Sequence, residues 1–215
     1  MRVIKSVRVI CLFSMINLFV LAIPQLSAQN TIKSNMTQPY DTITLGTGCF
    51  WCSQAIFERV KGVMSSTVGY SGGKMPNPTY RDVSTGTTGY AEVVQVVYNP
   101  QIVSLKTLLE IFWKTHNPTT LNRQGPDVGT QYRSVIFYHN PSQKLLAEKL
   151  KQKLEDAAIW DKPIITGISP FQNFYSAEKY HQEYYKNNPA AAYCQFVITP
   201  KIEKFEKVFS DKIKK

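Results

Sequence analysis

The chain has 215 residues, a length that suits one domain with a sizeable core. Its formal net charge is +10, and much of the excess lies in the C-terminal stretch TPKIEKFEKVFSDKIKK. No nucleic-acid-binding motif and no interleaving of aromatic and basic residues accompany this charge. We therefore interpret it as a solvated basic face and expect no nucleic-acid partner.

The first 28 residues have the order of a secretory signal peptide. Basic MRVIKSVR is followed by apolar VICLFSMINLFVLAI and by LSA, which resembles a small-residue cleavage site before Gln29. The apolar run is shorter than the roughly 20 residues of a membrane span. We therefore expect cleavage after Ala28 and export to the periplasm or the extracellular space, with an uncleaved membrane anchor as the alternative. Residues 29–40 are polar and are expected to form a flexible lead-in to one domain at 41–215.

The chain without this segment keeps three cysteines, namely Cys49, Cys52 and Cys194. Exported proteins usually carry paired cysteines in even number. An odd number means either a free reactive thiol or a pair whose third member changes partner. This count favours catalysis over a structural disulfide.

The first half of the domain alternates strands with helical and loop segments. The pattern predicts a strand in 41–48 that ends in a glycine-rich turn, a helix in 50–62, a strand in 63–70, a long loop over 71–89 and a strand in 89–100. A loop of this length in a compact domain tends to be functional.

The second half begins with a helix over 104–116, capped by Ser104. A second long loop over 116–131, a strand in 132–139, a helix over 141–160, a short strand in 163–170, an aromatic-rich helix over 176–189 and a last amphipathic helix are expected to follow. The helix over 141–160 has Pro141 at its first position and an apolar stripe of Leu145, Leu146, Leu150 and Leu154. This order, without a repeating strand–helix unit, predicts an α+β fold whose helices lie on one face of the sheet.

Cys49 follows Gly46-Thr47-Gly48 and opens a predicted helix. A thiolate at this position would meet unpaired N–H groups and the positive end of the helix dipole, and both lower a cysteine pKa. The sequence therefore predicts a reactive thiol, and the alternative is a buried, inert cysteine.

Glu92 and two tyrosines are further candidates. The alternation of AEVVQVVY places Glu92 on the same face as Val94 and Val96, where desolvation would raise its pKa and keep it protonated. The alternative is a glutamate that faces solvent at a strand end. Tyr70 ends one predicted strand and Tyr132 begins another, so each phenol either points into a site at the sheet end or packs in the core.

The stretches GCFWC, GYSGG, NPTY, GYAEVV, FWKTHNPTTLNRQGPDVGTQYRS and YHQEYYKNNP occur in the order and at the spacing of one family. Together they resemble peptide methionine sulfoxide reductase of the A type, from about residue 41 to about residue 204. The resemblance implies a two-layer α+β sandwich with a mixed sheet and a ferredoxin-like core, long loops and a coil-rich C-terminal tail. It implies no cofactor and no metal.

The resemblance also implies a role for each candidate residue. Cys49 would be the nucleophile, and Glu92 would be the acid that protonates the sulfoxide oxygen. The remaining positions would be Phe50 and Trp51 as walls around the S-methyl group, Tyr70 and Tyr132 as phenols that hold the oxygen, and Asp127 and His181 near the bound substrate. The substrate would be the S epimer of methionine sulfoxide, free or in oxidised proteins.

Two cysteines could then resolve the sulfenic acid formed on Cys49. Cys52 stands where many relatives have glycine and lies one helical turn from Cys49, although a bridge there could strain the helix end. Cys194 matches a tail cysteine of many relatives, and a mobile stretch over 187–192 could bring it to the site; we favour Cys194. Gln54, where relatives often have Glu, is interpreted as a minor change. A thioredoxin-like partner would reduce the disulfide, and we expect a monomer.

Two other classes fit part of the sequence. A thioredoxin-like disulfide oxidoreductase would use Cys49-Phe50-Trp51-Cys52 as its C-x-x-C motif, but the order of elements differs and GYSGG and GTQYRS are left unexplained. A zinc site would need a second ligand pair, and His181 and Cys194 have no familiar metal-ligand spacing. Disulfide exchange without sulfoxide reduction would support the first class.

Overall fold

The computed structural model describes residues 40–214. The predicted signal peptide and nearly all of the predicted lead-in lie outside these residues, so export and processing stay predictions. Within 40–214, no helix combines the length and the apolar character needed to cross a bilayer.

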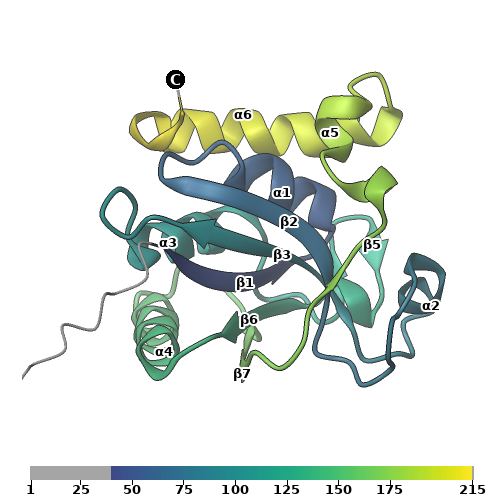
Figure 1. Cartoon of the computed structure of the whole chain (residues 1–215). Coiled ribbons are helices and arrows are strands. Elements are labelled where there is room, and N and C mark those ends of the chain that lie inside the picture. Colours follow the sequence, from purple (N-terminus) through teal and green to yellow (C-terminus); the bar gives the residue numbers. More distant parts are fainter. Residues whose placement is uncertain (1–39, 215) are drawn as a thin grey trace, which may run out of the picture. The chain divides into compact units, whose positions relative to one another are not determined.

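A mixed six-stranded sheet forms the centre of the domain (Figure 1). Its order is β7-β6-β1-β3-β2-β8, and every neighbouring pair is antiparallel except the parallel pair β6 and β7. The strands are β1 (Asp41–Thr47), β2 (Val63–Ser71), β3 (Ala91–Tyr98), β6 (Ser134–Tyr138), β7 (Gly167–Pro170) and β8 (Tyr175–Ser176). A separate hairpin consists of β4 (Arg123–Gln124) and β5 (Asp127–Val128).

The longer helices pack mainly against one face of this sheet. They are α1 (Phe50–Phe57), α2 (Tyr80–Ser84), α3 (Leu105–Thr115), α4 (Pro141–Asp156), α5 (Tyr184–Asn187) and α6 (Thr199–Val208). Short 3-10 turns occur at Thr130–Tyr132, Lys179–His181 and Ser210–Lys212, and a π-helical turn at Cys194–Ile198 leads into α6. Figure 1 shows α6 passing over α1, and contacts join α6 to both α1 and α3.

The main core lies between the sheet and the helices α1, α3 and α4. Alternate residues of the central strands, such as Leu45 and Val94, face Ile56 and Phe112 of the helices in one buried cluster. A smaller cluster on the other face is covered by aromatic side chains of the segment 171–174. This architecture confirms the predicted two-layer α+β sandwich with its mixed sheet.

Both predicted long loops contain regular elements. In 71–89, Thr79 and Asp82 form a reciprocal capping box that starts α2. In 116–131, the hairpin β4–β5 and a 3-10 turn replace the expected coil. These elements are too short to give a periodic sequence pattern, so the loop predictions were wrong in detail.

The predicted helix over 176–189 is also wrong. The segment forms β8, a 3-10 turn and α5, because the Gln182 side chain pairs with β2 just beyond the short edge strand β8. Its Oε1 accepts the Val68 N–H at 3.1 Å and its Nε2 donates to the Val68 carbonyl at 2.9 Å. Glu183 follows in the left-handed region with φ of 53°, which separates α5 from the preceding turn.

Two helix predictions need smaller corrections. α1 ends at Phe57 rather than near Gly62, because Val60 is fully buried and bridges to Ile213. On α4, the predicted stripe is only partly right, since Leu145 is 69% exposed while Leu146, Leu150 and Leu154 pack on the core.

Replacing Ser104 by alanine is expected to lower the free energy of unfolding by about 1 kcal/mol. The Ser104 Oγ accepts the Thr107 N–H at 3.1 Å and thereby caps α3, whose inner face is buried. Urea unfolding measures the change. Lys106→Ala is the matched control, because it removes only an exposed ion pair with Glu110 and should cost about 0.5 kcal/mol or less. Equal losses in both variants would contradict the cap.

Candidate functional site

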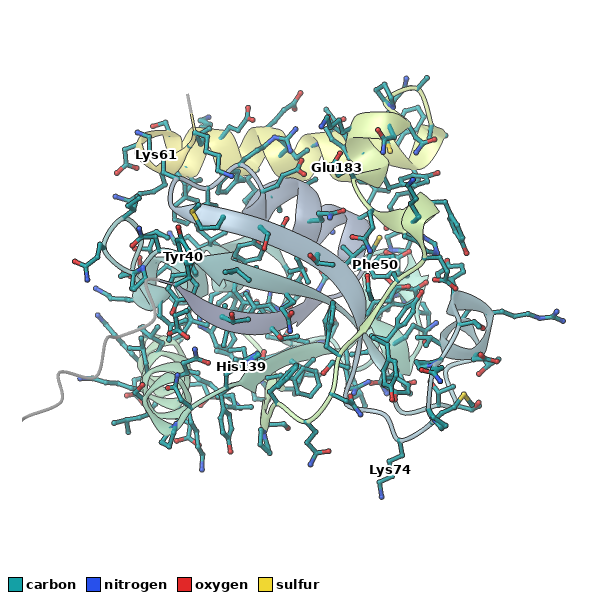
Figure 2. All side chains as sticks on the ribbon, in the orientation of Figure 1. Tyr40, Phe50, Lys61, Lys74, His139 and Glu183 are labelled. Carbon is teal, nitrogen blue, oxygen red and sulfur yellow. The ribbon has the colours of Figure 1, made fainter. Side chains whose placement is uncertain are left out.

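A small cleft opens where β1 ends and where β3 and α1 begin. Its volume is about 220 Å³, and its lining consists of Cys49, Phe50, Trp51, Tyr80, Glu92, Asp127, Tyr132 and Tyr193. Figure 2 labels Phe50 beside the end of the sheet, where the chain after β7 runs across it. Six of the ten predicted site residues therefore line one cavity.

The turn between β1 and α1 fixes the position of Cys49. Gly48 has φ of 96°, and a Cβ on it would lie 2.5 Å from the Cβ of Gln124, so only glycine fits. Cys49 is the N-cap residue of α1, and its carbonyl accepts the Ser53 N–H at 3.4 Å. The thiol is thus held at the helix start, as the sequence predicts.

The expected lowering of the Cys49 pKa is wrong. Cys49 is 5% exposed, and burial raises its pKa well above the ordinary value. A hydrogen bond with Cys52 and the nearby negative charges of Cys52 and Glu92 raise it further. The favourable helix start is outweighed by the loss of water around the sulfur.

The pKa of Cys52 is shifted in the opposite direction. The hydrogen bond from Cys49 lowers the pKa of Cys52 to about 7 against the effect of burial, and Lys201 lowers it as well. The Lys201 Nζ lies 3.6 Å from the Cys52 Sγ. Of the two neighbouring thiols, Cys52 therefore loses its proton first.

Glu92 lies on β3 and faces the helical layer, as the alternation with Val94 and Val96 predicts. The residue is 2% exposed, and its Oε2 accepts the Phe50 N–H at 3.1 Å. Burial raises the Glu92 pKa to about 8. The solvent-facing alternative is wrong, and the side chain is largely a neutral acid at pH 7.

The structure places Tyr132, but not Tyr70, in the cleft. Tyr70 is fully buried, and its hydroxyl donates to the Glu178 Oε2 at 2.9 Å. Tyr80 takes the expected place of Tyr70. It begins α2, its N–H donates to the Glu178 Oε1 at 2.8 Å, and its side chain lines the cleft. The motif NPTY already contained this residue, but nothing in its spacing set it above Tyr70.

His181 does not line the cleft either, and supports Trp51 from behind. Its Nδ1 accepts the Trp51 Nε1–H at 3.2 Å. Burial lowers the His181 pKa, which keeps the ring neutral and able to accept. The Trp51 ring also stacks on Tyr184, with 3.8 Å between centroids and 9° between planes. In this structure His181 therefore positions the indole from outside the cleft lining.

Asp127 lies in the cleft, where its Oδ2 accepts the Tyr193 hydroxyl at 2.7 Å. The Tyr193 ring also meets Trp51 edge-on, with 5.7 Å between centroids and 77° between planes. Sequence reasoning missed Tyr193. The only signal was its position directly before Cys194 in AAYCQF.

All three cysteines of the described region are free thiols and belong to one buried cluster. Cys194 is 0% exposed and begins the π-helical turn, instead of lying on an extended tail. The buried apolar residues that complete the cluster are Ala55 of α1, Ile198 of the π-helical turn and Ile202 of α6. Cys52 and Cys194 thus both belong to the cluster of the nucleophile candidate.

Gln54 has a larger role than expected. It is buried, its Nε2 donates to the Ser66 carbonyl at 2.8 Å, and its Oε1 accepts the Glu183 N–H at 2.8 Å. Gln54 therefore ties α1 to β2 and to the segment that carries His181 and Tyr184. The effect of exchanging the relatives' Glu for Gln at this position stays a prediction.

A buried thiol beside a neutral carboxylic acid, within reach of phenols and an indole, defines a cysteine-based oxidoreductase. The family model "Peptide methionine sulfoxide reductase" matches residues 41–213. The chain belongs to this family and is therefore a thiol-dependent oxidoreductase that acts on methionine sulfoxide.

Individual relatives support the same assignment. The chain is 52% identical over 174 residues to the peptide methionine sulfoxide reductase MsrA of Saccharolobus solfataricus, covering 81% of this chain and 97% of that protein. It is 50% identical over 179 residues to MsrA 1 of Rhodopirellula baltica, with 83% and 92% covered.

Solved structures agree with the fold. Reduced Mxr1 from Saccharomyces cerevisiae superposes with a TM-score of 0.67 at 38% identity, covering 73% of this chain and 90% of that one. Methionine sulfoxide reductase A of Corynebacterium diphtheriae gives 0.65 at 37% identity, with 73% and 78% covered. The C-x-x-C motif therefore lies in a reductase fold of this family, which argues against the thioredoxin-like alternative.

Proposed function

We propose that this protein reduces the S epimer of methionine sulfoxide, free or within oxidised proteins, with Cys49 as its nucleophile. The observation that carries the proposal is the shared cleft of the Cys49 thiol and the protonated Glu92 carboxyl. A thiol can attack the sulfoxide sulfur, and an acid beside it can protonate the departing oxygen.

The walls of the cleft suit a small apolar group next to a polar one. Phe50 and Trp51 offer aromatic surface for the S-methyl group, and His181, Tyr184 and Tyr193 hold the indole in place. Polar atoms face the same cavity from Glu92 and the tyrosines. A cavity with an apolar wall and a few directed polar groups fixes both the position and the orientation of a ligand.

The first step transfers the oxygen from the substrate to Cys49. The Cys49 sulfur attacks the sulfoxide sulfur as its proton is removed, and Glu92 donates its own proton to the oxygen. Hydrogen bonds from Tyr80 and Tyr132 stabilise the charge that develops there. Methionine leaves reduced, and Cys49 is left as a sulfenic acid.

The second step removes this hydroxyl group. A second cysteine attacks the Cys49 sulfur, the S–O bond breaks, and water leaves as a disulfide forms. A thioredoxin-like dithiol then reduces that disulfide. If residues 1–28 direct export, this reductant must be an exported protein, and the enzyme repairs methionine outside the cytosol as a monomer.

The deciding experiment supplies racemic methionine sulfoxide with dithiothreitol and follows each epimer by chiral chromatography. Loss of the S epimer alone is the expected result. If neither epimer fell while the protein still exchanged disulfides, the proposed function would be wrong. Subcellular fractionation with sequencing of the mature N-terminus tests export separately, and an N-terminus at Gln29 is expected.

Replacing Tyr80 by phenylalanine is expected to lower kcat for sulfoxide reduction by about tenfold, through loss of one hydrogen bond to the developing oxyanion. Tyr70→Phe removes the hydroxyl of a more deeply buried tyrosine, and that hydroxyl donates to Glu178 outside the cleft. This control should leave kcat within about twofold. Steady-state kinetics compares the variants, and a reversed order of the two effects would restore Tyr70 to the site.

A further inference from the structure

Lys201, which the sequence did not indicate as a site residue, lies next to the pair of Cys49 and Cys52. Lys201 reaches from α6 to Cys52, with 3.6 Å between Nζ and Sγ. We propose that Lys201 holds Cys52 as the anionic thiol of the pair and that Cys52, rather than Cys194, closes the first disulfide on Cys49. The inference rests on the proposed function, because it concerns the resolution of the same sulfenic acid.

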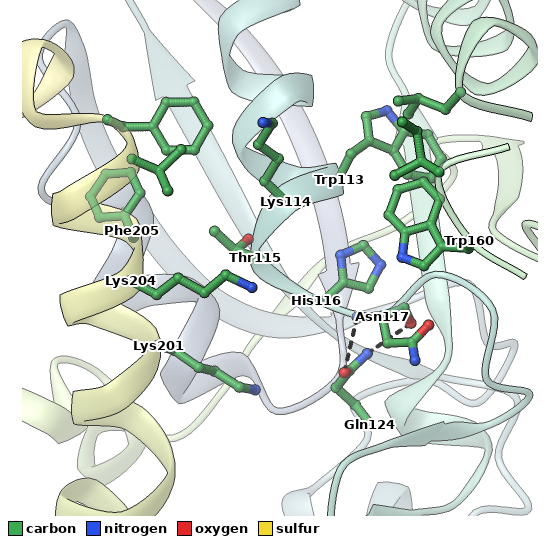
Figure 3. Close-up of a pocket in the computed structure, with 14 residues that line it drawn as sticks. Trp113, Lys114, Thr115, His116, Asn117, Gln124, Trp160, Lys201, Lys204 and Phe205 are labelled. Carbon is green, nitrogen blue, oxygen red and sulfur yellow. Dashed lines mark hydrogen bonds between the residues drawn. The ribbon is translucent and has the colours of Figure 1, made fainter. Parts of the chain in front are cut away.

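Lys201 is well placed for this task. It projects from α6 next to Lys204, toward a separate cleft of about 610 Å³ between α6 and the ends of α3 and α4 (Figure 3). In the part of the chain that the structure describes, the only side-chain acceptor of Lys201 is Cys52. A half-buried ammonium beside a sulfur stabilises the thiolate more than an exposed one would.

Other titratable groups face Cys52 from the surrounding elements, and most of them oppose its ionisation. Asp127 of β5 raises the Cys52 pKa, and negative charge on Cys52 in turn raises the pKa values of Glu92, Tyr193 and Cys194. The hydrogen bond from Cys49 and the charge of Lys201 act in the other direction and prevail. Lys201 is the only cation in this group.

Geometry favours the same cysteine. Cys49 is the N-cap of α1 with ψ of 123°, Cys52 follows one turn later in the same helix, and both residues belong to one buried cluster. A disulfide between them needs no movement of another segment. Burial raises the pKa of Cys194, which keeps it a protonated and weaker nucleophile.

Protons and charge balance along this route. Cys49 passes its proton to the Cys52 thiolate as it attacks the sulfoxide, while Glu92 protonates the oxygen. Lys201 favours loss of this proton from Cys52, so that the Cys52 anion attacks the Cys49 sulfur while the proton leaves with the hydroxyl group as water. The two sulfurs are oxidised, the sulfoxide is reduced, and the negative charge has moved from Cys52 to Glu92. An external dithiol returns two electrons and two protons, one to Cys49 and one to Glu92.

The electrostatic part is tested by alkylation of Cys52 with iodoacetamide across pH, read by peptide mass mapping in a Cys49→Ser background. The rate of alkylation rises with pH as Cys52 loses its proton. Lys201→Met should raise the midpoint of this rise by about one pH unit and slow alkylation at neutral pH about tenfold. Lys204→Met is the matched control, since Lys204 is an exposed lysine of the same helix, and it should leave the midpoint unchanged. Lys201→Arg should restore the low midpoint. Equal midpoints in the two methionine variants would overturn the role of Lys201.

The chemical part is tested by one turnover without reductant, quenched at intervals and mapped for disulfides. A Cys49–Cys52 bridge should appear first and at an unchanged rate in Cys194→Ser. Lys201→Met should prolong the Cys49 sulfenic acid, trapped with dimedone, about tenfold at neutral pH, with recovery at high pH. A first bridge between Cys49 and Cys194 with Cys52 still reduced would overturn the proposal. Release of methionine in the same samples separates this outcome from failure of the proposed function itself.

Discussion

Replacing Cys49 by serine is expected to abolish methionine sulfoxide reduction, with a loss on the order of 10⁴-fold or more in kcat/KM. The sulfur of Cys49 must accept the oxygen and then give it up as water, which requires an atom that can be oxidised. A serine hydroxyl cannot do this, whatever its position. The variant should still fold, because the N-cap contact to Ser53 uses the backbone carbonyl.

The measurement is methionine release in a single turnover, with thermal unfolding as the check on folding. Cys52→Ser is the matched control, since it removes a neighbouring buried thiol of the same helix but leaves the attacking sulfur. This control should still release methionine, but more slowly, because Cys52 is the proposed proton acceptor of Cys49. Residual turnover of the serine variant above the uncatalysed rate would identify another nucleophile.

Replacing Glu92 by glutamine is expected to lower kcat by about 10²- to 10⁴-fold, the usual range for loss of a general acid. Glutamine has nearly the same shape, and its carbonyl oxygen can still accept the Phe50 N–H. The change therefore removes the transferable proton more than it disturbs the packing. The wild-type rate should fall as pH rises through about 8, because Glu92 then loses the proton that it donates.

This alkaline limb should be absent from the pH profile of Glu92→Gln, measured on the residual activity. A limb that persists unchanged in the variant would assign it to another group. Cys52, with its pKa near 7, titrates nearby, so the profile is best compared with that of Cys52→Ser.

The same pKa has a consequence for stability. The Glu92 pKa is about 8 in the folded protein against 4.5 for an unperturbed glutamate, so the folded state binds more protons between these two pH values. The contribution of Glu92 is therefore fully present below about 4.5 and is lost as pH rises through 8. Urea unfolding at pH 6 and pH 9 should show a smaller decrease for Glu92→Gln than for the wild type.

Local sequence patterns were sufficient for the residues next to the nucleophile. A strand, a glycine turn and a helix start put Cys49 and Phe50 at one end of the sheet, and strand alternation put Glu92 on the buried face. These inferences need only the geometry of single elements and the pairing of neighbouring strands. The α+β class followed from the same patterns, and the two-layer sandwich from the family resemblance.

The errors concern features that depend on distant segments. Tyr70 and Tyr80 differ in role because Glu178, about a hundred residues away in the chain, binds the hydroxyl of one and the backbone of the other. The raised Cys49 pKa results from burial beneath the segment of Cys194. Neither effect has a periodic or local sequence signal.

The contacts of Trp51 should make the intrinsic fluorescence of this enzyme sensitive to the redox state of its cysteines. The indole sits between the two neighbouring cysteines in sequence and touches His181, Tyr184 and Tyr193, so a disulfide at either thiol alters the surroundings of the ring. Trp113 and Trp160 line the separate cleft and should contribute a steady background. Fluorescence of the unlabelled protein can therefore follow oxidation and recycling in real time.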